Sequence, residues 1–77
     1  RIERIISSGH FSPEGFCYDQ DENEFVALLQ GEAIITFEDG STKLKVGDTV
    51  LIPAHKKHRV DFTCTNPPCV WLCVFYL

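Results

Sequence analysis

Most of the structural information in this sequence lies in the stretch Gly47-Asp48-Thr49-Val50-Leu51-Ile52-Pro53-Ala54-His55-Lys56-Lys57-His58-Arg59-Val60. Its Gly-Asp pair favours a turn, and a short apolar run follows that Pro53 closes. Alternation then resumes at His58 and predicts a strand with His58, Val60 and Phe62 on one face. A histidine that shares a face with a valine and a phenylalanine points inward, where it needs a hydrogen-bond partner or a metal.

The rest of the chain predicts an all-β fold. No segment has the period of an amphipathic helix, and Gly, Pro, Asn and Asp interrupt the chain about every eight to ten residues, which is typical of a β-sandwich or barrel. The Asp39-Gly40 pair predicts a hairpin. We expect strands at residues 1–7, 16–20, 24–30, 32–38, 41–46, 49–52, 58–64 and 69–77, the first of them at a sheet edge or donated to a partner.

The length of 77 residues corresponds to one domain, which we expect to span residues 1–77. A chain this short is only marginally stable alone, so a bound metal or a partner would help. We expect a homodimer, and a first strand that lacks a few residues or is completed by the partner. The last strand supports this expectation, because residues 70–77 are apolar on both faces and the outer face needs a cover.

Charge and composition exclude some classes of partner. The net charge of −4, with both signs interspersed, argues against binding to nucleic acid or to anionic membranes. No run reaches the roughly 20 apolar residues of a membrane span, and no signal peptide is visible, so we expect a cytoplasmic protein.

The chain has four cysteines, which we expect to be thiols. Cys17, Cys64 and Cys73 lie in strand-like runs, where cysteine behaves as a small apolar residue. Cys64 and Cys69 flank a Thr-Asn-Pro-Pro turn and could pair if oxidised.

A second group of polar residues precedes the strand at residues 24–30. Glu24 shares a face with Val26 and Leu28, so it is either a solvated first residue or an inward carboxylate that needs a cation. Tyr18 and Gln20 share a face of the preceding short strand, and a turn at residues 21–23 would bring Gln20 close to Glu24.

Two motifs here resemble those of the cupin family. Gly47-x5-Pro53-x4-His58 is similar to the second cupin motif, Gly-x5-Pro-x-Gly-x2-His, except that His55 replaces its internal glycine. Glu24-x6-Gly31 is similar to the end of the first motif, Gly-x5-His-x-His-x3,4-Glu-x6-Gly. The resemblance covers the chain from about Phe16 to the end. It implies a small single-domain cupin β-barrel, that is, a double-stranded β-helix or jelly roll.

The resemblance also implies a site for a divalent metal, namely iron, manganese, zinc, nickel or copper. Glu24 and His58 match two of the family ligands, but the two first-motif histidines are replaced by Tyr18 and Gln20, or by Cys17 and Asp19 with the longer spacer. The implied ligand sets are therefore Gln20, Glu24 and His58, or Cys17, Asp19, Glu24 and His58. Alternatively, Glu24 and His58 pair with each other and with Tyr18 or Gln20, without a metal.

Our hypothesis for function is a cupin that binds a small molecule, with or without a divalent metal, and has no defined catalysis. We expect ligand contacts from Tyr18, Gln20 and His55, and a pocket lined by Val26, Leu28, Ala33, Ile35, Val50, Ile52, Val60 and Phe62. The alternative is a metal-dependent enzyme of the dioxygenase or isomerase type, acting on a small organic substrate, with Tyr18 and His58 as candidate catalytic residues. A third hypothesis is a purely structural role in dimerisation, with a pocket filled by the chain's own side chains.

Overall fold

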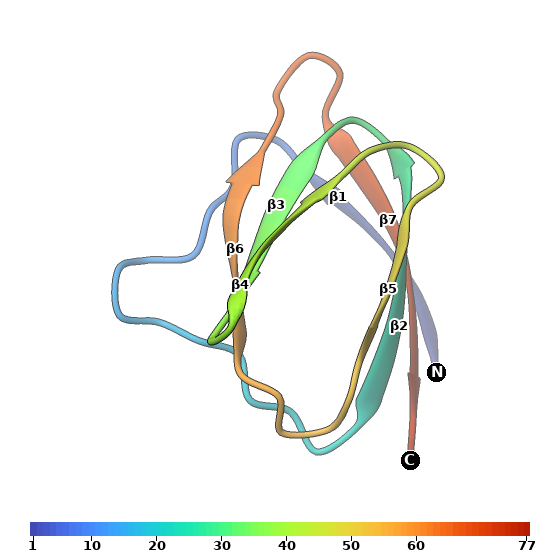
Figure 1. Cartoon of the computed structure of the whole chain (residues 1–77). Helices are drawn as coiled ribbons and strands as arrows, with labels where there is room; N and C mark the ends of the chain where they lie inside the picture. Colours follow the sequence, from blue (N-terminus) through green and yellow to red (C-terminus); the bar gives the residue numbers. More distant parts are fainter.

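A computed structural model describes residues 1–77 as two antiparallel sheets packed face to face (Figure 1). Its seven strands are β1 (Ile2–Ser7), β2 (Asn23–Gln30), β3 (Ala33–Phe37), β4 (Gly40–Leu44), β5 (Thr49–Ile52), β6 (His58–Thr63) and β7 (Cys69–Tyr76). One sheet has the order β1-β7-β2-β5 and the other β4-β3-β6. The all-β prediction is confirmed, and no helix is long and apolar enough to cross a membrane.

The turn at Gly47-Asp48 forms as the sequence predicts. Gly47 has a φ of +92°, which favours glycine, and its N–H donates to the Leu28 carbonyl at 2.9 Å. The Asp48 side chain accepts from the Lys45 N–H at 2.8 Å, which closes the turn. These bonds direct β5 along β2, where Val26 pairs with Val50.

Strand positions are confirmed except at residues 16–20. This segment makes only one isolated antiparallel bridge, between Tyr18 and His58. Pro13 and Gly15 shortly before it, and the acidic turn that follows, leave too short a stretch for a ladder. The predicted hairpin forms between β3 and β4, with Phe37 opposite Gly40. The first strand is indeed an edge strand.

A β-bulge in β6 makes one predicted orientation wrong. The neighbouring residues Ile34 and Ile35 of β3 pair with Phe62 and Val60, so Asp61 has no partner and the alternation shifts by one. Phe62 is therefore 45% exposed rather than inward, and Thr63 is buried in its place. The prediction holds for His58, which lies before the bulge and is 5% exposed.

The core lies between the two sheets. β7 is the largest contributor, because Cys69, Trp71, Cys73 and Phe75 all point inward. The other buried apolar residues come from β2 to β5: Val26, Leu28, Ala33, Ile35, Leu44 and Ile52. β7 lies between β1 and β2, so its outward face belongs to the middle of the four-stranded sheet.

Gly31 between β2 and β3 is held against the turn that joins β6 to β7. It has a φ of +91°, and a Cβ built on it would lie 2.6 Å from Cys64 Sγ and 3.0 Å from Cys69 Sγ. The position therefore requires glycine for two reasons: the backbone conformation and the space that the two sulfurs occupy.

We predict that Gly31→Ala lowers the free energy of unfolding by about 2–4 kcal/mol, because it combines backbone strain with overpacking. Gly15→Ala is the matched control, since Gly15 has a φ of +80° but nothing within 4 Å of a built Cβ. The control is expected to lose only about 1–2 kcal/mol, the cost of the left-handed backbone. Urea denaturation of both variants measures the difference, and equal losses would contradict the packing part of the argument.

Candidate functional site

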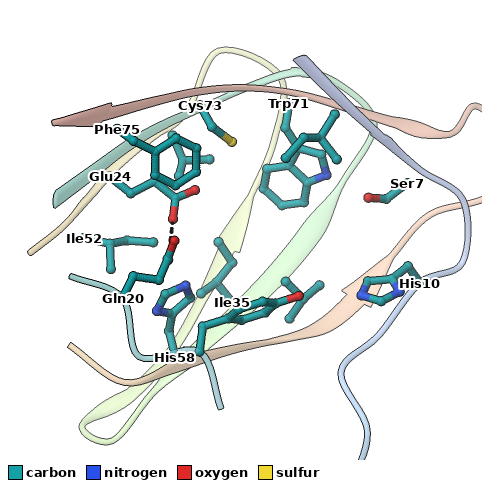
Figure 2. Close-up of a pocket in the computed structure, with 14 residues that line it drawn as sticks. Ser7, His10, Gln20, Glu24, Ile35, Ile52, His58, Trp71, Cys73 and Phe75 are labelled. Carbon is teal, nitrogen blue, oxygen red and sulfur yellow. Dashed lines mark hydrogen bonds between the residues drawn. The ribbon is translucent and has the colours of Figure 1, made fainter. Parts of the chain in front are cut away.

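A pocket of about 210 Å³ opens between the sheets and holds most of the predicted polar residues (Figure 2). Glu24, Gln20 and His58 lie at one end, and Ser7 and His10 at the other. The apolar walls between them are formed by Ile5, Val26, Ile35, Ile52, Val60, Trp71 and Phe75. The pocket thus has the general character of a small-molecule site, with apolar walls and a few convergent polar groups.

Glu24 is the charged residue of this pocket and is 8% exposed. It pairs with Ile52 on β5 and Phe75 on β7, so its side chain is fixed on the inner face of the sheet. Gln20 Nε2 donates to Glu24 Oε1 at 2.9 Å (Figure 2). Of the two interpretations of Glu24, the inward carboxylate therefore holds, and its first partner is a neutral amide rather than a cation.

Cys73 is a second partner of Glu24. Burial, together with the negative charge and hydrogen bonding of Glu24, raises the pKa of the Cys73 thiol to about 12. The thiol thus remains protonated at neutral pH and is a poor nucleophile. Sequence alternation within β7 pointed to this residue only weakly, because both faces of β7 are apolar.

His58 is held in a defined orientation by its neighbours. Its Nδ1 lies 3.0 Å from the Lys56 carbonyl oxygen, which can only accept, so Nδ1 carries the proton. The Tyr18 ring stacks on the imidazole at a centroid distance of 5.3 Å. In the neutral ring, Nε2 is then an acceptor without a partner. Every fully buried side-chain nitrogen or oxygen has a hydrogen-bond partner, so Nε2 is not fully buried and is accessible from the pocket that His58 lines.

Residues 18–20 reach the pocket without forming a strand. The Tyr18 N–H donates to the His58 carbonyl at 2.6 Å, and the His58 N–H donates to the Tyr18 carbonyl at 3.2 Å. This two-way bridge places Tyr18 and Gln20 on the pocket side, as the alternation predicted. Cys17 is exposed and Asp19 bonds His55, so the alternative set with Cys17 and Asp19 is not brought together with Glu24.

His55 lies outside this pocket, on the exposed loop between β5 and β6. Its φ is +64°, the conformation that the glycine of the family motif would adopt without strain. Its N–H donates to the Gln20 carbonyl at 2.7 Å, and its Nδ1 lies 2.9 Å from Asp19 Oδ1. His55 thus holds the segment that carries Gln20 rather than lining the cavity.

The residues that line the pocket differ from the predicted ones: four predicted residues are absent and several others are present. Leu28 and Ala33 are in the closed core, Val50 packs against that core, and Phe62 is turned out by the bulge. The pocket lining also contains residues of β7 and of the segment from Ile5 to His10, which were not predicted to line it. The apolar sequence of the last strand indicated a contribution from β7. The sequence of β1 carried no such signal, and the residues of β1 are mostly exposed.

The expected metal ligands Gln20, Glu24 and His58 include only two ionisable side chains. Gln20, Glu24 and His58 line the same pocket, but Gln20 turns its amide nitrogen toward Glu24. No group of three or more His, Cys, Asp or Glu side chains is close enough to hold a metal ion. Two ionisable donors and an amide do not fit the set that transition metals use in tight sites.

Comparison with known proteins agrees with the motifs and the fold. The family model described as Cupin domain matches residues 6–75. The chain is a cupin. No curated protein matches it significantly.

Several solved bacterial structures are similar to this cupin. A Ralstonia eutropha protein, provisionally named a mannose-6-phosphate isomerase, is 43% identical with a TM-score of 0.93, over 97% of this chain and 71% of that one. EutQ of Salmonella typhimurium, an ethanolamine utilization protein by provisional name, is 21% identical with a TM-score of 0.78, over 97% and 55%. A Bacteroides fragilis cupin is 22% identical with a TM-score of 0.67, over 97% and 61%. The last two show the fold alone.

The Cys73 thiol predicts a loss of stability in alkaline solution. Its pKa rises from 9.0 to about 12 on folding, so between these values the folded state retains a proton that the unfolded chain has lost. The free energy of unfolding should therefore be unaffected by this group below pH 9 and should fall as the pH rises from 9 to 12. We predict a flatter stability profile for Cys73→Ser, whose hydroxyl does not titrate there. Denaturant titrations at several pH values measure it, and identical slopes for the two proteins would contradict the assignment.

Proposed function

We propose that this cupin binds a small organic molecule, either uncharged or positively charged, in the pocket between the sheets. The observation that carries the proposal is the arrangement of the pocket: apolar walls with Glu24, Gln20 and His58 gathered at one end. Such a site buries the apolar part of a ligand and orients it by a few polar contacts.

The pocket volume limits the size of the ligand. A volume of about 210 Å³ corresponds to about seven water molecules in the liquid. An apolar protein cavity of roughly 150 Å³ can hold benzene. The pocket is therefore suited to a single ring with a short substituent, or to a molecule of similar size.

The charges around the pocket limit the chemistry of the ligand. Glu24 is buried in the wall, and no lysine or arginine lines the cavity. An anion placed there would meet a carboxylate without a cation to offset it, which is costly at low dielectric. A sugar phosphate, as the name of the Ralstonia relative would suggest, is therefore a poor candidate for this pocket.

Hydrogen bonding supports the same class of ligand. The His58 Nε2 lone pair and the Glu24 carboxylate are acceptors, and the partner amide of Gln20 is already directed at Glu24. Two acceptors at one end of an apolar cavity favour a ligand that donates, such as an alcohol or an amine.

The enzyme alternative has less support than binding. A metal-dependent dioxygenase or isomerase typically uses a third ionisable ligand beside a carboxylate and a histidine, and no third His, Cys, Asp or Glu joins Glu24 and His58. A metal-free proton transfer by His58 remains chemically open, because the Lys56 carbonyl fixes the ring with a free Nε2. Tyr18, which stacks on His58 and lines the same pocket, is the candidate acid partner for such a transfer, whereas Cys73 holds its proton up to a pKa of about 12.

Three ligands of similar size and different charge test the proposal: benzylamine, benzyl alcohol and benzoate. We predict that the amine and the alcohol bind at least about tenfold more tightly than benzoate, a difference of about 1.4 kcal/mol. Isothermal titration calorimetry measures the affinities. Amide chemical shifts of pocket residues such as Ile35, Trp71 and Phe75 locate the site.

Glu24→Gln is the matched variant, because it keeps the size of the side chain and removes the charge. The preference for benzylamine over benzoate should shrink to roughly threefold or less in this variant. Tightest binding of benzoate to the unmodified protein would overturn the proposed charge class. No shift of pocket amides with any of the three would overturn binding of small ring molecules in this pocket.

We also propose that a second copy of the chain covers the outer face of the four-stranded sheet. In register, Ile2, Val74, Phe25 and Leu51 form an apolar row across all four strands of this face. Ile2 and Leu51 are 71% and 57% exposed, and the neighbouring row places Arg4 beside Leu72 and Ala27. Permanent homodimer interfaces are more apolar than transient ones, and this face fits the permanent class.

Light scattering coupled to gel filtration tests this proposal. We predict a particle of twice the 8.7 kDa chain mass at micromolar concentration, and dissociation of Leu51→Glu to monomers at the same concentration. Val46→Glu is the control, because Val46 is also well exposed but lies in the turn after β4, away from this face. A monomeric unmodified protein, or equal dissociation of both variants, would contradict the proposed interface.

A further inference from the structure

Cys64 and Cys69 form a close pair of thiols at the β6–β7 turn. Their Sγ atoms lie 3.4 Å apart. Cys69 is buried and Cys64 is partly exposed, and neither lines the pocket between the sheets. All four cysteines are free in this structure, so the pair has no role in the binding proposed above.

We propose that Cys64 and Cys69 are a redox site, which closes to an intramolecular disulfide when the protein meets a hydroperoxide. The two residues flank the short turn in which Thr65 bridges to Pro68, so they face each other across the end of a hairpin. A disulfide brings its sulfurs to about 2.0 Å, which rotation of the two side chains from their present contact can supply.

The backbone around the pair holds both sulfurs in place. Cys64 Sγ lies 2.9 Å from the Pro67 carbonyl oxygen, and Cys69 Sγ lies 2.9 Å from the Glu32 carbonyl oxygen. The Glu32 N–H points at Cys64 Sγ from 3.2 Å. Gly31 completes the arrangement, since its missing side chain leaves the space in which the two sulfurs meet. The contact is thus built by three backbone groups and the space at Gly31 rather than by chance proximity of two surface side chains.

The accessibility of the two thiols sets the order of the chemistry. Burial, and then the hydrogen bond with Cys64, raises the pKa of Cys69, so Cys64 is the thiol that a hydroperoxide reaches first. The Cys64 thiolate attacks one peroxide oxygen, the O–O bond breaks, and the alcohol or water leaves with a proton. The Cys69 sulfur then attacks the Cys64 sulfenic acid, an S–S bond forms, and water leaves. Two thiols are oxidised and one peroxide is reduced.

The other two cysteines lack what this reaction needs. Cys17 is exposed but has no thiol beside it. Cys73 is buried in the pocket wall near Glu24, and its pKa of about 12 keeps it protonated. Oxidation should therefore be confined to one pair, and it should stabilise the fold by closing the β6–β7 hairpin.

Peptide mapping tests the proposal directly. The folded protein is treated with hydrogen peroxide, then unfolded in the presence of iodoacetamide so that buried free thiols are also blocked. It is then digested with chymotrypsin, which cleaves after Phe62 and Trp71. The peptide Thr63–Trp71 then contains Cys64 and Cys69 and no other cysteine. We expect this peptide to lose the mass of two hydrogens and to escape alkylation. After reduction with dithiothreitol, it should regain the two hydrogens and react with iodoacetamide at both cysteines.

Two variants separate the pair from nonspecific oxidation. Cys17→Ser should form the same disulfide as the unmodified protein, whereas Cys64→Ser should form none. Trp71, the only tryptophan, reports unfolding by its fluorescence, and the denaturation midpoint of the unmodified protein should rise on oxidation and return on reduction. An unmodified Thr63–Trp71 peptide, a disulfide that involves Cys17, or Cys64 trapped as sulfinic acid beside a free Cys69 would each overturn the proposal.

Discussion

The position of β7 between β1 and β2 is the constraint on which the rest of this structure depends. Antiparallel pairing on both sides fixes which face of β7 points inward, and Trp71, Cys73 and Phe75 then form the core and one wall of the pocket. The same pairing turns Val70, Leu72 and Val74 outward, to the middle of the opposite face. One apolar strand therefore produces both the binding pocket and the surface proposed to meet a second copy.

Periodicity and turn residues predicted the fold well, because these signals are local. The Gly47-Asp48 turn and the burial of His58 follow from the sequence alone, whereas for Glu24 the sequence left both a solvated and an inward position open. The bulge at Asp61 could not be predicted in this way, since alternation assumes that every residue has a partner across the ladder. The inner face of β7 was equally hidden, because a strand that is apolar on both faces carries no alternation from which to choose.

The pocket shows what a cupin retains when the two first-motif histidines are absent. Tyr18 stacks on His58, and Gln20 satisfies Glu24 from the position where a metal-binding histidine would be expected. The protonated Cys73 thiol lines the same pocket. The neighbours of the inward charge are thus neutral groups, and its remaining capacity as an acceptor faces the cavity.

The loop between β5 and β6 supports this arrangement from outside the pocket. A histidine with a φ of +64° is strained where the family motif has glycine, so the position must gain something in return. His55 gains contacts that a glycine lacks, because its ring reaches Asp19 while its N–H binds the Gln20 carbonyl. Both contacts anchor residues 19 and 20, which form no strand of their own and have few other bonds. The strained loop thereby fixes the Gln20 amide that donates to Glu24. The replacement of the motif glycine by His55 thus stabilises the polar end of the pocket.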